Sequence, residues 1–315
     1  MSSTMKRAFF AGGALVALLS LSAEARADGL ALGSSRIAPA SRTKLAEDIA
    51  AFKSAEPGLR AKVRDVQSVK PEVYGKFQNP KPEASRELRR LGKDALVPML
   101  EALAFDASQP GLAAHEREAL KLGMIEAVGY LKDSRSVPVL TAIFADESEA
   151  TDTALAAATA LGMVCDTAAV KVLEGKAFDG SKTRLAALSG LGECRRIQTA
   201  KTLASALRGA QDDATRQVVI RALGTLGSSW AWAALGKDNA DAGAKVRIEA
   251  SDALIETFVA APALRAESKR AILKCEASNA IARIQAAKKG QNADTVKALE
   301  DLEKKLNKAA ARAGR

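Results

Sequence analysis

Residues 127–140, AVGYLKDSRSVPVL, form a segment that recurs in altered form along the middle of this 315-residue chain. Its glycine returns three more times, each time after a pair of small or aliphatic residues: Ala127-Val128-Gly129, Ala160-Leu161-Gly162, Gly190-Leu191-Gly192 and Ala222-Leu223-Gly224. A leucine follows each glycine by eleven places, so successive leucines are 33, 30 and 32 residues apart: Leu140, Leu173, Leu203 and Leu235. A fixed period near thirty is typical of a solenoid, in which each unit buries its apolar face against its neighbours.

Each unit divides into two expected helices. The first ends near the glycine, where small residues allow a second helix to approach closely. The second carries apolar residues eight and eleven places after the glycine, one helical step apart: Val137 and Leu140, Val170 and Leu173, Ala200 and Leu203, Trp232 and Leu235. We therefore predict that the four leucines of this series are buried and equivalent, and that residues 245–273 form a further unit with Ile255 in the place of the glycine.

The pattern resembles the HEAT-like repeat family, in particular the short bacterial type first named from phycobilisome lyases. Residues 127–140 match best, with the Gly, Asp, Arg, Val-Pro and Leu of the family in order. The family tends to place a basic residue eight before the glycine, as at Lys121, Arg184 and Arg216 here, although the second unit has Ala154 at this place. The resemblance covers residues 83–275 and implies an all-α, right-handed solenoid of stacked antiparallel helix pairs, with the second helices lining the concave face. We expect the basic residues to pair with turn acids such as Asp133 or Asp166 and so to link the units.

The N-terminus has the pattern of a secretory signal peptide. Lys6 and Arg7 precede an apolar run over residues 8–21, and Ala25-Arg26-Ala27 is a small-x-small cleavage site, so we predict cleavage after Ala27. The alternative is a membrane anchor, but fourteen apolar residues are too few to cross a bilayer comfortably. No later stretch is apolar enough to span a membrane. We expect a periplasmic or secreted protein.

Removal of residues 1–27 lowers the formal net charge from +10 to +8. A basic exported protein meets acidic partners, such as cell-envelope polymers, anionic lipids or acidic proteins. Nucleic acid is a poor candidate partner once export is accepted.

The segments on either side of the repeat are expected to cap the two ends of the solenoid. Residues 28–82 are expected to be a linker with one capping helix over 41–54 and a proline-rich stretch over 55–82 that is mostly loop. Residues 276–315 are expected to hold capping helices and a basic tail. An amphipathic last helix is predicted from apolar residues at helical spacing, Val296, Leu299, Leu302 and Leu306.

Catalytic motifs are absent from the sequence. The chain has one histidine, His115, in a charged helical stretch, where a surface position is expected. No phosphate-binding loop, metal-ligand spacing or cofactor motif is present, so the sequence predicts no enzyme, no cofactor and no metal site. The three cysteines are Cys165, Cys194 and Cys275. Export permits a Cys165–Cys194 disulfide, and buried free thiols are the alternative.

A binding stripe is predicted on the second helices. Positions six and nine after the glycine place Trp230, Lys171 and Lys201 on one exposed stripe, with Arg208 about two helical turns beyond Lys201. An exposed tryptophan beside cations resembles an interface anchor. In the alternative, Trp230 packs over the neighbouring unit, as we expect of Trp232.

Three functions are compatible with these features. The leading one is a non-catalytic exported scaffold that binds a protein or cell-envelope partner through the solenoid surface. The second, by analogy with the lyases that named the repeat, is an enzyme or enzyme subunit. The third is a membrane-surface or envelope-polymer binder that uses the basic C-terminal helix.

Overall fold

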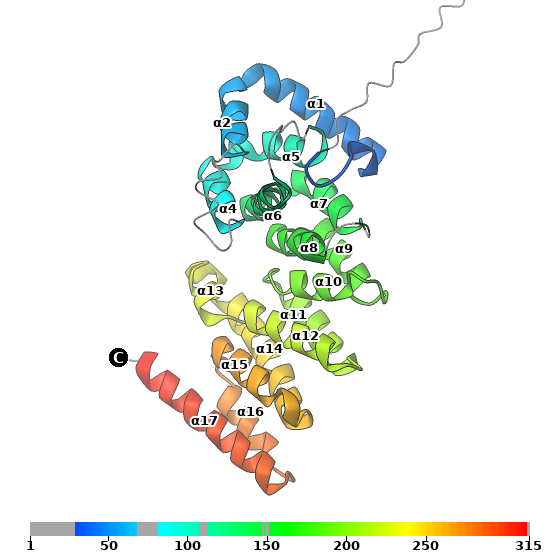
Figure 1. Ribbon diagram of the computed structural model, residues 1–315. Helices are drawn as coiled ribbons and strands as arrows, with labels where there is room; N and C mark the ends of the chain where they lie inside the picture. Colours follow the sequence, from blue (N-terminus) through cyan, green and yellow to red (C-terminus); the bar gives the residue numbers. More distant parts are fainter. Residues whose placement is uncertain (1–28, 68–80, 107–112, 147, 149–150, 314–315) are drawn as a thin grey trace, which may run out of the picture.

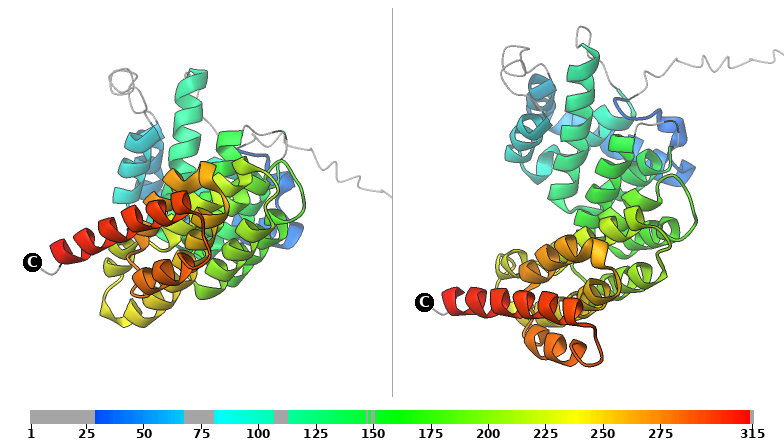
Figure 2. Two further views of the ribbon diagram at one scale, coloured as in Figure 1. Left: turned by 90° about the horizontal axis from the view of Figure 1, so that it is seen from below. Right: turned by 60° about the horizontal axis from the view of Figure 1, so that its bottom comes forward.

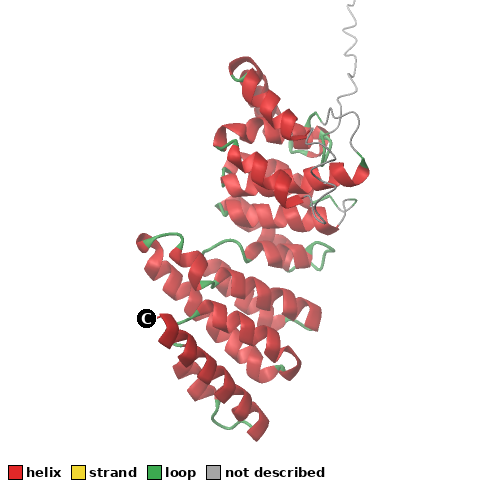
Figure 3. Cartoon of the chain, turned by 60° about the vertical axis from the view of Figure 1, so that its left-hand side comes forward, coloured by secondary structure: helices red, strands yellow, loops and turns green. Residues whose placement is uncertain are grey.

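The protein is all-helical in the part that the computed structural model describes, residues 29–67, 81–106, 113–146, 148 and 151–313. The helices follow one another along an elongated molecule (Figures 1 and 2), and no strand occurs in the described ranges (Figure 3). The predicted signal peptide over residues 1–27 lies outside these residues.

A first row of helices runs through the molecule, each packed on the next. It consists of α4 (Lys81–Arg90), α6 (Ala114–Leu131), α8 (Thr151–Val164), α10 (Arg184–Leu191) and α12 (Asp213–Leu226). Four of these are followed by a helix of a second row, twice through a 3-10 turn: η2 (Lys93–Ala95) and α5 (Leu96–Ala104), η3 (Ser134–Ser136) and α7 (Val137–Phe144), α9 (Thr167–Ala177), and α11 (Ile197–Gly209).

The repeated glycine is the contact point between neighbouring helices of the first row. A Cβ added to Gly129 would lie 2.7 Å from the Cα of Ala160, and one added to Gly192 would lie 2.8 Å from the Cα of Ala222. Each alanine stands two places before the glycine of its own unit. The glycine of one unit thus touches the small residue of the next, which explains why the two recur together.

The regular stack changes after α12. Gly224 meets Ala271 of α15 (Arg265–Cys275), so α15 takes the next place in the first row. The corresponding small residues, Ala222 and Ala271, are 49 positions apart instead of about thirty. The extra residues form α13 (Ser229–Ala233), η4 (Lys237–Asn239), α14 (Ala240–Ala260) and η5 (Pro262–Leu264). Residues 245–273 do form a packed helix pair, α14 with α15. Because α14 packs against α11, however, it fills the second-row place, so Ile255 does not stand at the first-row position of the glycine that we expected.

The predicted core leucines are buried in three of the four units. Leu140, Leu173 and Leu203 have no exposed surface, whereas Leu235 is 39% exposed. The prediction is wrong for Leu235 because α13 ends at Ala233 and Gly236 then turns the chain with a φ of +87°.

The basic residues eight before the glycine follow the prediction at Arg184, which pairs with a turn acid of the next unit, but the two turn acids that we named have other partners. Arg184 reaches the next unit, where its guanidinium lies 3.3 Å from Asp212. Asp133, however, pairs with Arg135 of its own turn, and Asp166 accepts a backbone hydrogen bond at the start of α9. Arg184 thus links two units, whereas the turn acids that we named, Asp133 and Asp166, serve local roles.

The N-terminal helices cover the first end of the stack. They are α1 (Pro39–Ala55), preceded by η1 (Ser34–Arg36), and α2 (Pro57–Gln67). The proline-rich region, predicted to be mostly loop over 55–82, therefore contains a helix, and its residues 68–80 lie outside the described part of the chain. Pro57 begins α2, and a proline in the first helical position loses no helical hydrogen bond. Both helices contact α5, every residue of which is buried.

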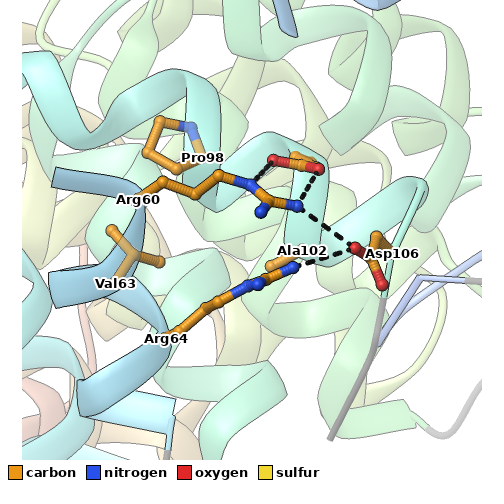
Figure 4. Close-up of a pocket in the computed structure, with 7 residues that line it drawn as sticks. Arg60, Val63, Arg64, Pro98, Ala102 and Asp106 are labelled. Carbon is orange, nitrogen blue, oxygen red and sulfur yellow. Dashed lines mark hydrogen bonds and ion pairs between the residues drawn. The ribbon is translucent and has the colours of Figure 1, made fainter. Parts of the chain in front are cut away.

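A buried carboxylate, that of Glu101 on α5, holds these N-terminal helices. It accepts hydrogen bonds from Arg60 Nε at 3.0 Å and Arg60 Nη2 at 2.8 Å, and it lies 2.9 Å from Lys53 Nζ. Arg60 and Arg64 also reach Asp106, as Figure 4 shows. Burial by itself raises the pKa of Glu101, but the bonds from Arg60 and Lys53 outweigh it and hold that pKa below its usual value.

The C-terminal end of the stack is covered by α16 (Ala280–Ala287) and α17 (Ala293–Ala313). Leu299, Leu302 and Leu306 of α17 are buried, and α17 packs on α15 and α16. Within the described residues, none of the helices has both the length and the apolar character needed to span a bilayer.

Candidate functional site

The helices α9, α11, α14 and α16 form a continuous surface, which we call the second-row face. α14 contacts both α11 and α16, and Thr202 Oγ1 of α11 donates a 2.8 Å hydrogen bond to Glu174 Oε1 of α9. The outward residues of α11 follow helical spacing because Leu203 and Leu207 occupy its buried side: Gln198, Lys201, Ser205 and Arg208.

Three of the four predicted binding residues lie on this face. Lys171 of α9 and Lys201 of α11 are exposed on either side of the Glu174–Thr202 hydrogen bond, and neither forms an ion pair with a described residue. Arg208 lies at the far end of α11, next to α14.

Trp230, the fourth predicted binding residue, lies outside the second-row face. Its helix, α13, packs on α14 and on α15 of the first row, and the tryptophan is 81% exposed. Trp230 therefore does not pack over a neighbouring unit, nor does it stand on a helix of the second row. Trp232 is 6% exposed, and its indole N–H donates a 2.8 Å hydrogen bond to the carbonyl oxygen of Leu226.

A network of charged side chains continues from Arg208 across α14 to α16. The Arg208 guanidinium lies 3.3 Å from Glu256, whose other oxygen is 3.4 Å from Arg283. Arg283 also donates to Asp252 at 2.9 Å, as does the amide of Asn279 at 3.0 Å. Exposed ion pairs contribute little stability, typically about 0–1 kcal/mol each, but a shared network limits the positions of its side chains.

A cavity of about 340 Å³ opens beside this network, between α14 and α16. Its wall is apolar and its rim polar: Ile255, Val259, Ala286 and Ala287 in the wall, and Glu256, Arg283 and Gln291 at the rim. An apolar wall with a few polar groups suits an apolar side chain whose neighbours are hydrogen-bonded at the rim. Sequence reasoning missed this cavity, although Asp252 and Glu256, four residues apart on one helix side, were a signal for a polar stripe.

Cys165 and Cys194 are joined by a disulfide that links the end of α8 to the turn after α10. Their Cα atoms are 5.0 Å apart, closer than the usual spacing of stacked helices, because the two cysteines are offset by one place in the repeat. Cys275 is buried as a free thiol, and burial raises its pKa to about 12. His115 is exposed on α6.

Comparison with known proteins gives little information about function. No protein-family model and no curated protein matches the chain. Among solved structures, it is similar to human deoxyhypusine hydroxylase in complex with glycerol, with 18% identity and a TM-score of 0.34, over 85% of this chain and 99% of that one. This matched structure is that of an enzyme, whereas the sequence predicted a non-catalytic chain, and we withdraw that prediction. A likeness at this TM-score carries no argument about the fold or the activity of this chain.

Proposed function

We propose that this chain is an exported, right-handed solenoid of HEAT-like repeats that binds a protein partner along its second-row face. The observation that carries the proposal is the cavity between α14 and α16, which lies at the end of a row of exposed cations, Lys171, Lys201 and Arg208. The repeat pattern supports the solenoid, and the signal-peptide pattern of residues 1–27 supports export to the periplasm or beyond.

In this proposal the cavity takes an apolar anchor side chain of the partner. Burying such a side chain contributes about 1.5–3 kcal/mol, and a few anchors of this kind dominate most protein interfaces. Arg283 and Glu256 at the rim would hydrogen-bond the backbone or polar side chains beside the anchor. Acidic residues of the partner would lie near Lys171 and Lys201, which steers association more than it adds affinity.

Affinity capture from a cell-envelope fraction tests this proposal. Ala286→Phe fills the cavity, and Lys171→Glu with Lys201→Glu reverses the charge of the two exposed lysines on α9 and α11. Ala282→Phe is the matched control, because Ala282 is exposed on the same helix but does not line the cavity. We expect the wild type and Ala282→Phe to capture the same partner, and the other two variants to lose it with unchanged melting temperatures. Equal capture by all variants would refute the proposal.

A further inference from the structure

The short helix α13 presents an apolar surface that packs on nothing in the described part of the chain. Trp230 is 81% exposed, Leu235 is 39% exposed, and Ala233 and Ala234 are exposed between them. Trp232 fixes the helix beneath them: its ring lies against Gly243 of α14, where an added Cβ would come within 2.9 Å. Trp230 is thus held outward on an anchored helix.

The excess positive charge of the chain gathers in the same region. Residues 214–290 contain twelve Lys and Arg against seven Asp and Glu, whereas residues 28–213 contain 26 against 25. Seven of these twelve cations form no ion pair with any described residue. Arg247 and Arg265 are held by hydrogen bonds, and Lys289 follows α16. The other four are exposed on the elements that flank or contact α13: Arg221, Lys237, Lys245 and Lys274.

The C-terminal end of α17 points to the same side of the molecule as α13. Figures 1 and 2 show both projecting in one direction from the stack. Lys304 and Lys308 are exposed on α17, on the side away from its buried leucines, and neither forms an ion pair with a described residue. The apolar surface of α13, the cations on the elements around it and the C-terminal end of α17 with its lysines therefore lie toward one side of the protein.

We propose that this side docks the protein on an anionic phospholipid bilayer, with Trp230 inserted at the headgroup boundary. The indole ring prefers the membrane–water interface, where its apolar body and its polar N–H are both satisfied. Unpaired lysines and arginines around an inserted apolar residue are attracted to anionic headgroups. The exposed residues that follow Trp230 are Ala233, Ala234 and Leu235, which together offer a small apolar projection that suits a soft lipid layer.

Co-sedimentation with phospholipid vesicles tests this inference. The chain should start at Asp28, so that the apolar run at residues 8–21 does not itself bind lipid, and this chain keeps every residue that the structure describes. We expect binding to vesicles of phosphatidylcholine mixed with phosphatidylglycerol, little binding to phosphatidylcholine alone, and a decrease as salt is raised. Tryptophan emission should shift to the blue when the anionic vesicles are added.

Point variants then identify the surface. Trp230→Ala should weaken binding about tenfold and abolish the emission shift, because the interfacial anchor is gone. Phe178→Ala is the matched control, since Phe178 is 59% exposed on the turn after α9 and should bind as the wild type. Lys237→Glu with Lys245→Glu, and separately Lys304→Glu with Lys308→Glu, should each weaken binding at low salt. Truncation of α17 is unsuitable, because it would expose the core that its leucines cover.

Two results would overturn the inference. One is the absence of wild-type binding to the anionic vesicles. The other is equal binding by the wild type and a folded Trp230→Ala. If Trp230→Ala loses a captured protein while the wild type does not bind vesicles, the surface is a protein interface. This test can be told apart from the test of partner binding on the second-row face. Ala286→Phe and the charge reversal at Lys171 and Lys201 should abolish partner capture but leave vesicle binding unchanged.

Discussion

At the scale of single residues, the glycines of the repeat set the distance between helices. A side chain at Gly129 or Gly192 has no space, because the backbone of the next helix occupies it. Gly175, in the interior of α9, has nothing within 4 Å of an added Cβ. The same residue type thus serves close packing in one row and has no packing role in the other.

Gly129→Ala and Gly175→Ala should therefore have opposite effects. We expect Gly129→Ala to lower the free energy of unfolding by about 1–3 kcal/mol, because the added methyl group forces α6 and α8 apart. Gly175→Ala should raise it by about 0.5–1 kcal/mol, because alanine favours the helix. Urea unfolding of both variants checks the prediction, and equal effects would show that our register of the first row is wrong.

The leucine series provides a second test at this scale. Leu140→Ala, Leu173→Ala and Leu203→Ala should each cost about 2–5 kcal/mol, because each opens a cavity in a closed core. Leu235→Ala should change stability by no more than about 0.5 kcal/mol, because Leu235 is partly exposed at a turn. Urea unfolding again measures the change, and a large loss of stability in Leu235→Ala would contradict the exposed position of Leu235 in the turn after α13.

At the scale of elements, α1 and α2 depend on a charged contact with α5. A buried carboxylate without a partner of opposite charge strongly destabilises the folded state, so Glu101 requires Arg60 and Lys53. The folded state holds the pKa of Glu101 below its usual value, so its ion pairs stabilise the fold above that value. The stabilisation is lost as the pH falls through the lowered pKa.

A pH series of unfolding measurements on the wild type and Glu101→Gln tests this contact. At pH 7 the wild type should be the more stable, because glutamine cannot pair with both cations. The difference should begin to shrink as the pH falls below the usual pKa of a glutamate, because the unfolded chain then binds a proton at this residue first. It should vanish below the lowered pKa of folded Glu101, where the side chain is neutral in both states. Glu56→Gln is the control, because Glu56 is exposed at the end of α1. A difference that stays constant with pH would mean that the ion pairs of Glu101 do not hold these helices.

At the scale of the whole molecule, the sequence predicts the all-helical class and the recurrence of the glycines, because both depend on spacing within about thirty residues. It did not predict the partner of those glycines, which is the first helix of the next unit and not the second helix of the same unit. The insertion after α12 could not be predicted in this way. Residues 224–235 continue the repeat pattern, but which helix packs on Gly224 depends on residues near Ala271, almost fifty positions later. The cavity between α14 and α16 and the outward position of Trp230 both follow from that insertion.

The second-row face is the central claim, and hydrogen–deuterium exchange of the chain with and without its captured partner tests it most directly. Backbone amides that an interface covers exchange more slowly. We predict added protection in α11, α14 and α16, around the cavity and the Arg208–Glu256–Arg283 network, and no change in α13. Protection confined to α13, α17 or the helices of the first row, with α14 and α16 unchanged, would contradict the account.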